Sequence, residues 1–460
     1  MTSSNRDLVV VGGGAGGISA ARAGLRRGLQ TVLIQDGRVG GDCTFTGCVP
    51  SKVLIEAAAK GRPFKDAMSQ LHNVVEKIAS TESSEVLERE GIEVIEARAH
   101  FVSPLTLSAR DHTIHARKII LATGSRPVIP PISGLAEIDY LTNENVFELS
   151  TLPDSISVLG GGPIGCELAQ MFRRMGATVH LFEAAGRLLL REEPEASEVI
   201  AGALIADGVI LHLGVSVNAF VPSSDGHGVQ TFTDEGSVVT EKLLVGVGRR
   251  PVVEGLDPTS GNVELDERGF IRTDQFLRTS ASGVYAVGDI TGLLPFTHAA
   301  DEMGRIAVRN AFSRYGRTRF DVSSIPWVTF TDPEVARVGL RESDAPQSGT
   351  RIAYLPMASV DRAVITGETD GFVKLIAGPK PVLRSIGGGK IIGATIVSSR
   401  AGEMIHEIVL AMRTKAFVGR LAQMVHAYPT WSTAIRQAAA QFFFEIDGRR
   451  ARPKDTDSSR

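Results

Sequence analysis

Short apolar runs and glycine-rich turns alternate along the chain in an order typical of parallel α/β domains. Residues 7–11 form an apolar, β-branched run, which predicts a buried strand. This run leads into a glycine loop at 12–17 and then into an alanine-rich stretch, which predicts a helix. A second apolar run follows at 31–34. The chain therefore opens with a strand, loop, helix and strand.

The glycine spacing of this loop is that of a dinucleotide-binding turn. Gly12 permits a tight turn, Gly14 lets the backbone approach a pyrophosphate, and Gly17 lets the helix pack closely on the strand. The helix N-terminus attracts the phosphate charge. The acid that normally binds ribose at the end of the second strand is either replaced by Gln35 or displaced to Asp36.

A second copy of the pattern lies near the middle of the chain. A strand at 157–159 leads into a loop with Gly160, Gly162 and Gly165, and the following strand ends at Glu183. Two complete fingerprints in one chain are much stronger evidence for nucleotide binding than one glycine loop.

Glu183 predicts a preference for NADH. A carboxylate at this position accepts hydrogen bonds from ribose hydroxyls and repels a 2′-phosphate. Arg187 and Arg191 lie close enough in sequence to accept a 2′-phosphate, so NADPH remains the alternative.

Size and charge exclude several functions. The 460 residues suit two to three domains, and the hydrophobic content of 43% is enough to fill several cores. Because 49 basic residues face 52 acidic ones, we expect no nucleic acid or anionic membrane as partner. No apolar run approaches the roughly 18 residues that cross a bilayer, and residues 1–6 do not resemble a signal peptide. The composition predicts a cytoplasmic protein.

Three cysteines are too few for a disulfide framework or a four-thiolate metal site, and we predict no metal ligands. Cys43 and Cys48 form a C-x4-C pair, whose spacing alone is weak evidence. Pro50 suits the first turn of a helix beginning near Cys48, and Lys52 lies close by. A helix start and a nearby cation both favour a thiolate, so the pair is a candidate redox centre. Cys166 is expected to be a small buried residue.

The segment 40–52 resembles the active-site segment of the flavin-dependent pyridine nucleotide-disulfide oxidoreductases. Residues 122–125 and 247–251 are similar to the family's domain-closing segments, and 279–289 is similar to its second flavin motif. The resemblance extends over about residues 6–445. It implies an oxidoreductase with FAD and NADH as cofactors.

The resemblance also implies an α/β fold with two Rossmann-like dinucleotide-binding domains, for FAD and NAD, plus a C-terminal α+β dimerisation domain. Family members are homodimers whose active site is shared across the interface. The implied layout is an FAD domain at 1–150, an NAD domain at 151–273, a return to the FAD domain at 274–324, an interface domain at 325–445 and a flexible tail at 446–460.

Residue roles follow from the resemblance. Cys48 would contact the flavin, Cys43 would exchange with substrate, Lys52 would lie near the flavin ring and Glu167 would pair with Lys52 beside the nicotinamide. The terminal aspartate of the second flavin motif, Asp289, would bind the ribityl chain. The implied cofactor-binding set is Gly12, Gly14, Gly17, Gln35, Asp36, Lys52, Thr123, Gly124, Gly160, Gly162, Gly165, Glu183, Gly248, Arg249 and Asp289.

The C-terminal region departs from the family's disulfide reductases, which carry a catalytic His-Pro pair followed by a glutamate. Here Tyr428 takes the histidine's place and Thr433 the glutamate's. A phenol is a poor base at neutral pH. His426, two residues earlier, is a candidate substitute. Tyrosine at this place is similar to the mercuric reductase branch, although this chain lacks that branch's C-terminal cysteine pair and carries His298 as the dehydrogenases do.

Three hypotheses remain open. The first is a mercuric-reductase-like enzyme that passes electrons from NADH through Cys43 and Cys48 to a soft metal ion or another small oxidant. The second is a dihydrolipoamide dehydrogenase, or related disulfide reductase, that uses His426 or solvent for proton transfer. The third is a redox-sensing or electron-transfer flavoprotein that acts on a protein partner.

Overall fold

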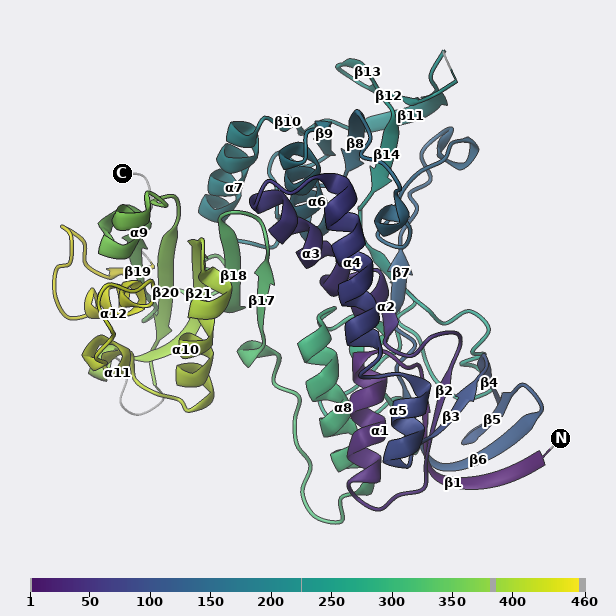
Figure 1. Ribbon diagram of the computed structural model, residues 1–460. Coiled ribbons are helices and arrows are strands. Elements are labelled where there is room, and N and C mark those ends of the chain that lie inside the picture. The colour runs from purple at the N-terminus through teal and green to yellow at the C-terminus, as the bar shows by residue number, and fades with distance from the viewer. Residues whose placement is uncertain (1, 225, 381–385, 455–460) are drawn as a thin grey trace. The chain divides into compact units, whose positions relative to one another are not determined.

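The computed structural model describes residues 2–224, 226–380 and 386–454 (Figure 1). The chain divides into two compact units, each with its own core. The first unit contains Met1–Pro131, Asp139–Leu152 and Leu244–Asp321, and the second contains Ile132–Ile138, Pro153–Leu243 and Val322–Arg460.

The first unit is built on a mixed sheet. Strand β1 (Thr2–Val11) lies between β2 (Thr31–Gln35) and β6 (His112–Leu121), and the three strands are parallel. Leu8, Val9 and Val10 are completely buried, in keeping with the apolar run at the C-terminal end of β1. The sheet also contains β3 (Glu93–Glu96) and β16 (Val284–Ala286), which pair in parallel, and β4 (Ala99–Ser103) and β5 (Thr106–Ala109), which pair antiparallel.

The helices of the first unit include the two that carry the cysteines. Figure 1 shows α1 and α8 side by side, and α3 and α4 side by side. A short antiparallel pair, β7 (Ser125–Pro127) and β15 (Arg249–Pro251), joins two of the segments that resemble family motifs. The helices are α1 (Ala15–Leu25), α2 (Gly41–Phe45), α3 (Cys48–Ala59), α4 (Phe64–Ala79), α5 (Ser84–Glu90) and α8 (Thr297–Phe312).

The second unit contains the second glycine fingerprint. Its four-stranded sheet has the order β10-β9-β8-β14, in which β8 (Ser155–Leu159), β9 (Thr178–Glu183) and β10 (Ile210–Leu213) are parallel. The other elements of this region are α6 (Pro163–Arg174), α7 (Pro194–Asp207), β11 (Val217–Pro222), β12 (Val229–Thr233), β13 (Gly236–Thr240) and β14 (Lys242–Val245).

The C-terminal region of the second unit is an antiparallel sheet covered by helices. Its strand order is β17-β18-β21-β20-β19-β22. The strands are β17 (Pro326–Thr329), β18 (Glu334–Gly339), β19 (Arg351–Pro356), β20 (Phe372–Gly378), β21 (Lys390–Ser398) and β22 (Arg452–Pro453). The helices are α9 (Asp361–Thr366), α10 (Ala401–Arg413), α11 (Val418–Gln423) and α12 (Thr433–Ala440).

These elements confirm the predicted α/β fold class with two Rossmann-like regions and a C-terminal α+β region. The finer domain boundaries stay predictions. Within the expected tail, Arg452 pairs with Ile352 as part of β22, whereas residues 455–460 lie outside the described residues. In the described parts of the chain, none of the helices has the length and apolar character needed to span a bilayer.

Candidate functional site

The two cysteines of the candidate redox pair lie on two consecutive helices of the first unit. Cys43 belongs to α2, and Cys48 is the first residue of α3. Gly47 joins the two helices, and a Cβ at this position would lie 2.9 Å from the carbonyl oxygen of Asp42 and 3.3 Å from the Cα of Cys43. Only glycine fits the close approach that brings the two thiols together.

The two cysteines differ in how readily their thiols lose a proton. A hydrogen bond to Cys48 raises the pKa of the half-buried Cys43 thiol, and burial and the charge of Cys48 raise it further. Cys48 occupies the first turn of α3, where the helix dipole favours a negative charge. The arrangement therefore favours a thiol at Cys43 and a thiolate at Cys48.

Thr297 is a third member of this centre, which was not among the residues predicted from the sequence. Its hydroxyl oxygen lies 3.6 Å from the sulfur of Cys48, and its hydrogen bond to Cys43 partly offsets the rise in the pKa of that thiol. Thr297 begins α8, and the exposed His298 follows it with its ring stacked on Phe296. The only sequence signal for Thr297 is its place directly before His298.

Cys48 also lies at the edge of a groove of ≈ 490 Å³ along α3 and α4. Four apolar side chains and Lys52 line it together with polar groups. The complete lining is Cys48, Val49, Lys52, Val53, Glu56, Lys60, Gln70, Val74 and Ile78. The predicted residue Lys52 therefore shares a surface with Cys48.

The first glycine loop has the geometry of a dinucleotide cradle. Gly12 has φ +107°, and a Cβ there would lie 2.2 Å from the carbonyl oxygen of Ala122. A Cβ on Gly17 would lie 1.8 Å from the oxygen of Gly12, whereas Gly14 is open to a ligand approaching the backbone. The loop thus fits the pyrophosphate of FAD.

The two candidate ribose residues of this loop have different roles. The side-chain oxygen of Gln35 accepts a hydrogen bond of 2.5 Å from the N–H of Gly13, and its amide donates to the oxygen of Asp36. The carboxylate of Asp36 is exposed and ion-paired with Arg98 at 3.4 Å. Gln35 therefore stabilises the loop itself.

Arg249 links the candidate ribityl residue to the dithiol loop. Its guanidinium donates to Asp42, to the hydroxyl of Ser125 at 2.7 Å and to Asn143 at 3.2 Å. The same hydroxyl donates at 2.6 Å to the carboxylate of Asp289, whose pKa is raised mainly by burial. The structure therefore brings Arg249 and Asp289 together beside the turn that carries Cys43.

Other members of the predicted set support this cluster. Thr123 donates its hydroxyl at 2.7 Å to the oxygen of Val252, and Gly124 and Gly248 both have positive φ. Asn143 also donates to the oxygen of Thr46 at 3.1 Å, which ties the cluster to the turn between the cysteines. Neither Asn143 nor the Ser125 hydroxyl was among the site residues predicted from the sequence.

The second glycine loop repeats the first. Gly160 has φ +110°, a Cβ on Gly165 would lie 1.9 Å from the oxygen of Gly160, and Gly162 is open. The carboxylate of Glu183 accepts hydrogen bonds of 2.8 Å from the N–H groups of Gly161 and Ala185. This loop fits the pyrophosphate of a nicotinamide dinucleotide with Glu183 beside it.

Arg187 and Glu167 are both engaged within the second unit. The guanidinium of Arg187 donates to Ser197 at 2.7 Å and to carbonyl oxygens of its own loop. Glu167 is buried on α6 and accepts a hydrogen bond of 2.8 Å from the N–H of Phe330. Lys52 belongs to the other unit, so the pairing of Lys52 with Glu167 stays a prediction.

The C-terminal candidates point in different directions. Tyr428 is 73% exposed, and a hydrogen bond to Asp361 raises the pKa of its phenol. The side chain of His426 is only 7% exposed, and its Nε2 lies 3.0 Å from Glu407. Its buried Nδ1 has no hydrogen-bond partner in the described parts of the chain. His426 is therefore turned into its own domain, away from the surface that Tyr428 occupies.

Comparisons with known proteins agree with this architecture. The chain is 33% identical to a mercuric reductase of Streptomyces lividans, with 96% of this chain and 97% of the relative covered. It is 31% identical to a dihydrolipoyl dehydrogenase of Thermus scotoductus, with 94% and 96% covered.

Solved structures give the same result. A Cu(II) complex of the HOCl-induced flavoprotein disulfide reductase RclA from Escherichia coli matches with TM-score 0.87 and 28% identity, covering 96% of this chain and 99% of that one. LpdA from Mycobacterium tuberculosis matches with TM-score 0.84 and 27% identity, covering 95% and 100%.

Two family models cover most of the sequence. The model of the pyridine nucleotide-disulphide oxidoreductases matches residues 6–304, and that of their dimerisation domain matches residues 325–439. Members of this family are FAD-dependent and use NAD(P)H. The chain belongs to the pyridine nucleotide-disulfide oxidoreductases.

Proposed function

We propose that the protein uses NADH to reduce a soft metal ion at the Cys43–Cys48 pair. Relatives named mercuric reductase support a metal ion as the acceptor. The observation that carries the proposal is the combination of a thiol pair with an exposed Tyr428 and a His426 that is buried against Glu407. Exchange with a disulfide substrate needs a proton carrier near neutral pH, whereas a metal ion binds thiolates without one.

The residues act in a simple order. Cys48 presents a thiolate, Thr297 supports it, and Cys43 releases its remaining proton when a divalent ion binds both sulfurs. When bound, FAD would supply two-electron transfer from NADH, and the first glycine loop and Asp289 would hold it. The balanced reaction is NADH + M²⁺ → NAD⁺ + H⁺ + M⁰.

We also propose that the protein is a homodimer formed through residues 325–445. The matched dimerisation domain supports this, as do the large exposed apolar side chains of Val425, Tyr428 and Phe444. Association would bring Tyr428 of one protomer to the dithiol of its partner, where its phenol helps to hold the metal ion.

A panel of electron acceptors tests the proposal. Anaerobic NADH oxidation is compared with mercuric ion in excess thiol, lipoamide, glutathione disulfide and a naphthoquinone. We expect mercuric ion reduction to exceed disulfide reduction. Tyr428→Phe should impair mercuric ion reduction more than quinone reduction, because only the first uses the phenol.

A gain-of-function variant makes the test sharper. Tyr428→His combined with Thr433→Glu restores the family's proton carrier and should raise lipoamide turnover, since general acid–base catalysis commonly contributes about 10²–10⁴-fold. Rapid lipoamide turnover by the unmodified protein, unaffected by Tyr428→Phe and lost in His426→Ala, would instead establish a dihydrolipoamide dehydrogenase with a relocated base.

A small aromatic oxidant such as a quinone is the second candidate. The groove beside Cys48 favours it, because Val49, Val53, Val74 and Ile78 give that surface an apolar wall. Turnover of the naphthoquinone that persists in Cys48→Ser but falls in Val53→Glu would assign the groove to this acceptor. Turnover unaffected by Val53→Glu would exclude it.

A further inference from the structure

A buried polar network ties the second glycine loop to the C-terminal region of the same unit. The residues 188–195, here called the anchor segment, connect the loop after β9 to the start of α7. The N–H of Leu189 donates at 2.9 Å to the oxygen of Gly161, and Leu188 packs so closely that a Cβ on Gly161 would lie 2.6 Å from it. The anchor segment therefore begins in direct contact with the glycine loop.

The centre of the anchor segment is held by two side chains from neighbouring strands. Trp327 on β17 and Arg337 on β18 are directly opposite in the antiparallel register. The indole N–H of Trp327 and the Nε of Arg337 each donate at 2.8 Å to the carboxylate of Glu192, one to each oxygen. Arg337 also donates at 2.8 Å to the backbone oxygen of Arg191 and stacks on the Trp327 ring, 4.1 Å from its centroid.

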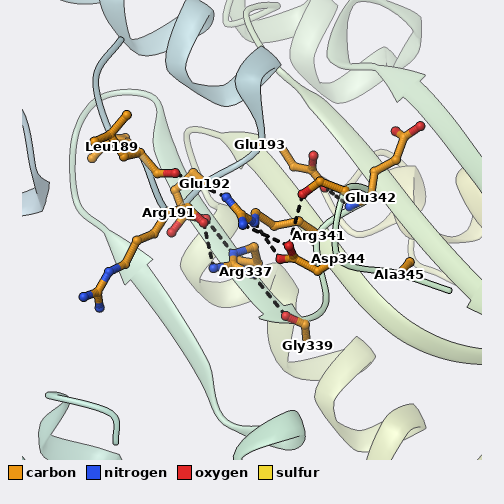
Figure 2. Close-up of polar contacts among 12 residues, drawn as sticks. Leu189, Arg191, Glu192, Glu193, Arg337, Gly339, Arg341, Glu342, Asp344 and Ala345 are labelled. Carbon is orange, nitrogen blue, oxygen red and sulfur yellow. Dashed lines mark hydrogen bonds and ion pairs between the residues drawn. The ribbon is translucent and has the colours of Figure 1, made fainter. Parts of the chain in front are cut away.

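Figure 2 shows how further donors extend this network. The guanidinium of Arg341 donates at 3.2 Å to the backbone oxygen of Leu190, and the N–H of Glu342 donates at 2.7 Å to Glu193. Lys374, which is 2% exposed, lies within 3.4 Å of carboxylate oxygens of Glu193, Glu195 and Glu342. The anchor segment is thus held through its backbone as well as its side chains.

The acceptors of these hydrogen bonds distinguish the network from ordinary packing between two regions of a unit. Apolar contacts would join the two regions at lower desolvation cost, because burying charges is expensive even when they are paired. Arg337 and Arg341 instead fix the carbonyl groups of two consecutive residues immediately after Leu189. Leu189 has φ +47°, a strained conformation for a leucine that persists only where its surroundings hold it.

We propose that Arg337, together with Trp327, is a positioning residue for the nicotinamide dinucleotide. It holds Glu192 and the anchor segment so that Leu189 keeps Gly161, and hence the glycine loop, in its ligand-ready position. The inference rests on the proposed assignment of the second glycine loop to NADH, and it does not depend on the acceptor.

Rapid-mixing reduction of the FAD-loaded protein by NADH tests this positioning role without any acceptor. The dependence of the flavin reduction rate on NADH concentration yields the Kd for NADH and the limiting rate. Arg337→Leu should raise the Kd about tenfold, the equivalent of one charge-assisted hydrogen bond, with little change in the limiting rate. Arg337→Lys should recover part of the loss.

Arg174→Leu is the matched control. Arg174 also forms an ion pair across the two regions, with Asp332 at 2.9 Å, but at the far end of α6 from the glycine loop. The Arg174→Leu variant should have a lower Tm than the unmodified protein but the same Kd for NADH. If Arg337→Leu lowers the Tm and leaves the Kd unchanged, the network is only structural and the inference is wrong.

Two further measurements keep the test decisive. If Arg337→Leu does not fold, Trp327→Phe removes a single N–H and should raise the Kd about threefold, as expected for a weaker neutral donor. An unchanged Kd in Trp327→Phe and in Arg337→Lys would then overturn the inference. Failure of the NADH assignment is seen separately, as an unchanged Kd in Glu183→Ala.

Discussion

The two glycine loops of this chain are held by the same pair of hydrogen bonds. In the first, Gln35 accepts a hydrogen bond from the N–H of Gly13, and the N–H of Gly40 donates at 2.8 Å to the oxygen of Gly13. In the second, Glu183 accepts from the N–H of Gly161, and Leu189 donates to its oxygen. In each copy, the middle glycine of the loop is held from two sides. The last residue of the second strand accepts from its N–H, and the segment that follows this strand, here called the returning segment (Gly40 in the first copy, Leu189 in the second), donates to its oxygen.

The copies differ in what the returning segment does next. After Gly40 the chain forms α2 and α3, which carry Cys43 and Cys48. After Leu189 it enters the network around Glu192 and Arg337. With the roles proposed above, the same scaffold leads into the reacting cysteines in the first copy and into a positioning network in the second.

The largest effect is expected from replacing Cys48, which the proposed function makes a reacting group. Cys48→Ser should reduce mercuric ion turnover by about three orders of magnitude or more, as loss of a reacting nucleophile usually does. Cys166→Ser is the matched control, because Cys166 is fully buried in the second copy and donates only to the oxygen of Gly161. Equal turnover in both variants would show that the electrons bypass the sulfur pair.

An effect of about fivefold is expected when Glu183 of the second loop is replaced by glutamine, the residue that the first loop carries at this place as Gln35. Glu183→Gln keeps an acceptor for the N–H of Gly161 but removes the negative charge. Because hydrogen bonds to a charged group exceed neutral ones by about 1 kcal/mol, the ratio of kcat/KM for NADH over NADPH should fall about fivefold. Gln35→Glu should leave this ratio unchanged. A higher kcat/KM for NADPH in the unmodified protein would contradict the assignment of Glu183.

Local patterns explain why the loops were predictable from the sequence. The glycine positions follow from steric conflicts within a few residues or with the adjacent strand, as at Gly12, Gly17 and Gly165. The helix at Cys48 and the strand ends at Gln35 and Glu183 are likewise encoded nearby. The same short-range physics forms these elements in any protein with this spacing.

The remaining parts of the site depend on contacts across long stretches of sequence. Arg249 meets Asp42 from 207 residues away, and Arg337 meets Glu192 from 145 residues away. Thr297 is a common residue at the start of a helix, and nothing local indicates that its hydroxyl reaches Cys48 from 249 residues away. Polar residues of this kind carry no periodic signal, so their partners emerge only from the folded chain.

A smaller effect concerns the charge state of the reduced pair. The pKa of Cys43 is raised chiefly by its hydrogen bond to Cys48, so Cys48→Ala should lower it, while burial keeps it above the ordinary value. In the reduced unmodified protein, Cys43 should therefore stay protonated at a higher pH than in the variant. The pH dependence of iodoacetamide alkylation at Cys43, followed by mass spectrometry, measures the difference. If the pH midpoint of Cys43 alkylation is higher in Cys48→Ala than in the unmodified protein, Cys48 does not raise the pKa of Cys43 and the assignment of the thiol to Cys43 is wrong.

The smallest effect should come from replacing Thr297. This variant tests whether a residue distant in sequence supports Cys48 after the first glycine loop, as Arg337 is proposed to support the anchor segment after the second. Thr297→Val keeps the shape of the side chain but removes the hydroxyl 3.6 Å from the Cys48 sulfur. Losing a hydrogen bond to the thiolate disfavours its charged form, so the acid limb of the thiolate–flavin absorption should move to higher pH. A bond worth about 1 kcal/mol corresponds to somewhat less than one pH unit. Thr297→Ser keeps the hydroxyl and should leave the acid limb in place. An identical shift in both variants would attribute the effect to packing at the start of α8. The hydroxyl of Thr297 would then have no role in stabilising the Cys48 thiolate, and only the second glycine loop would depend on a distant residue.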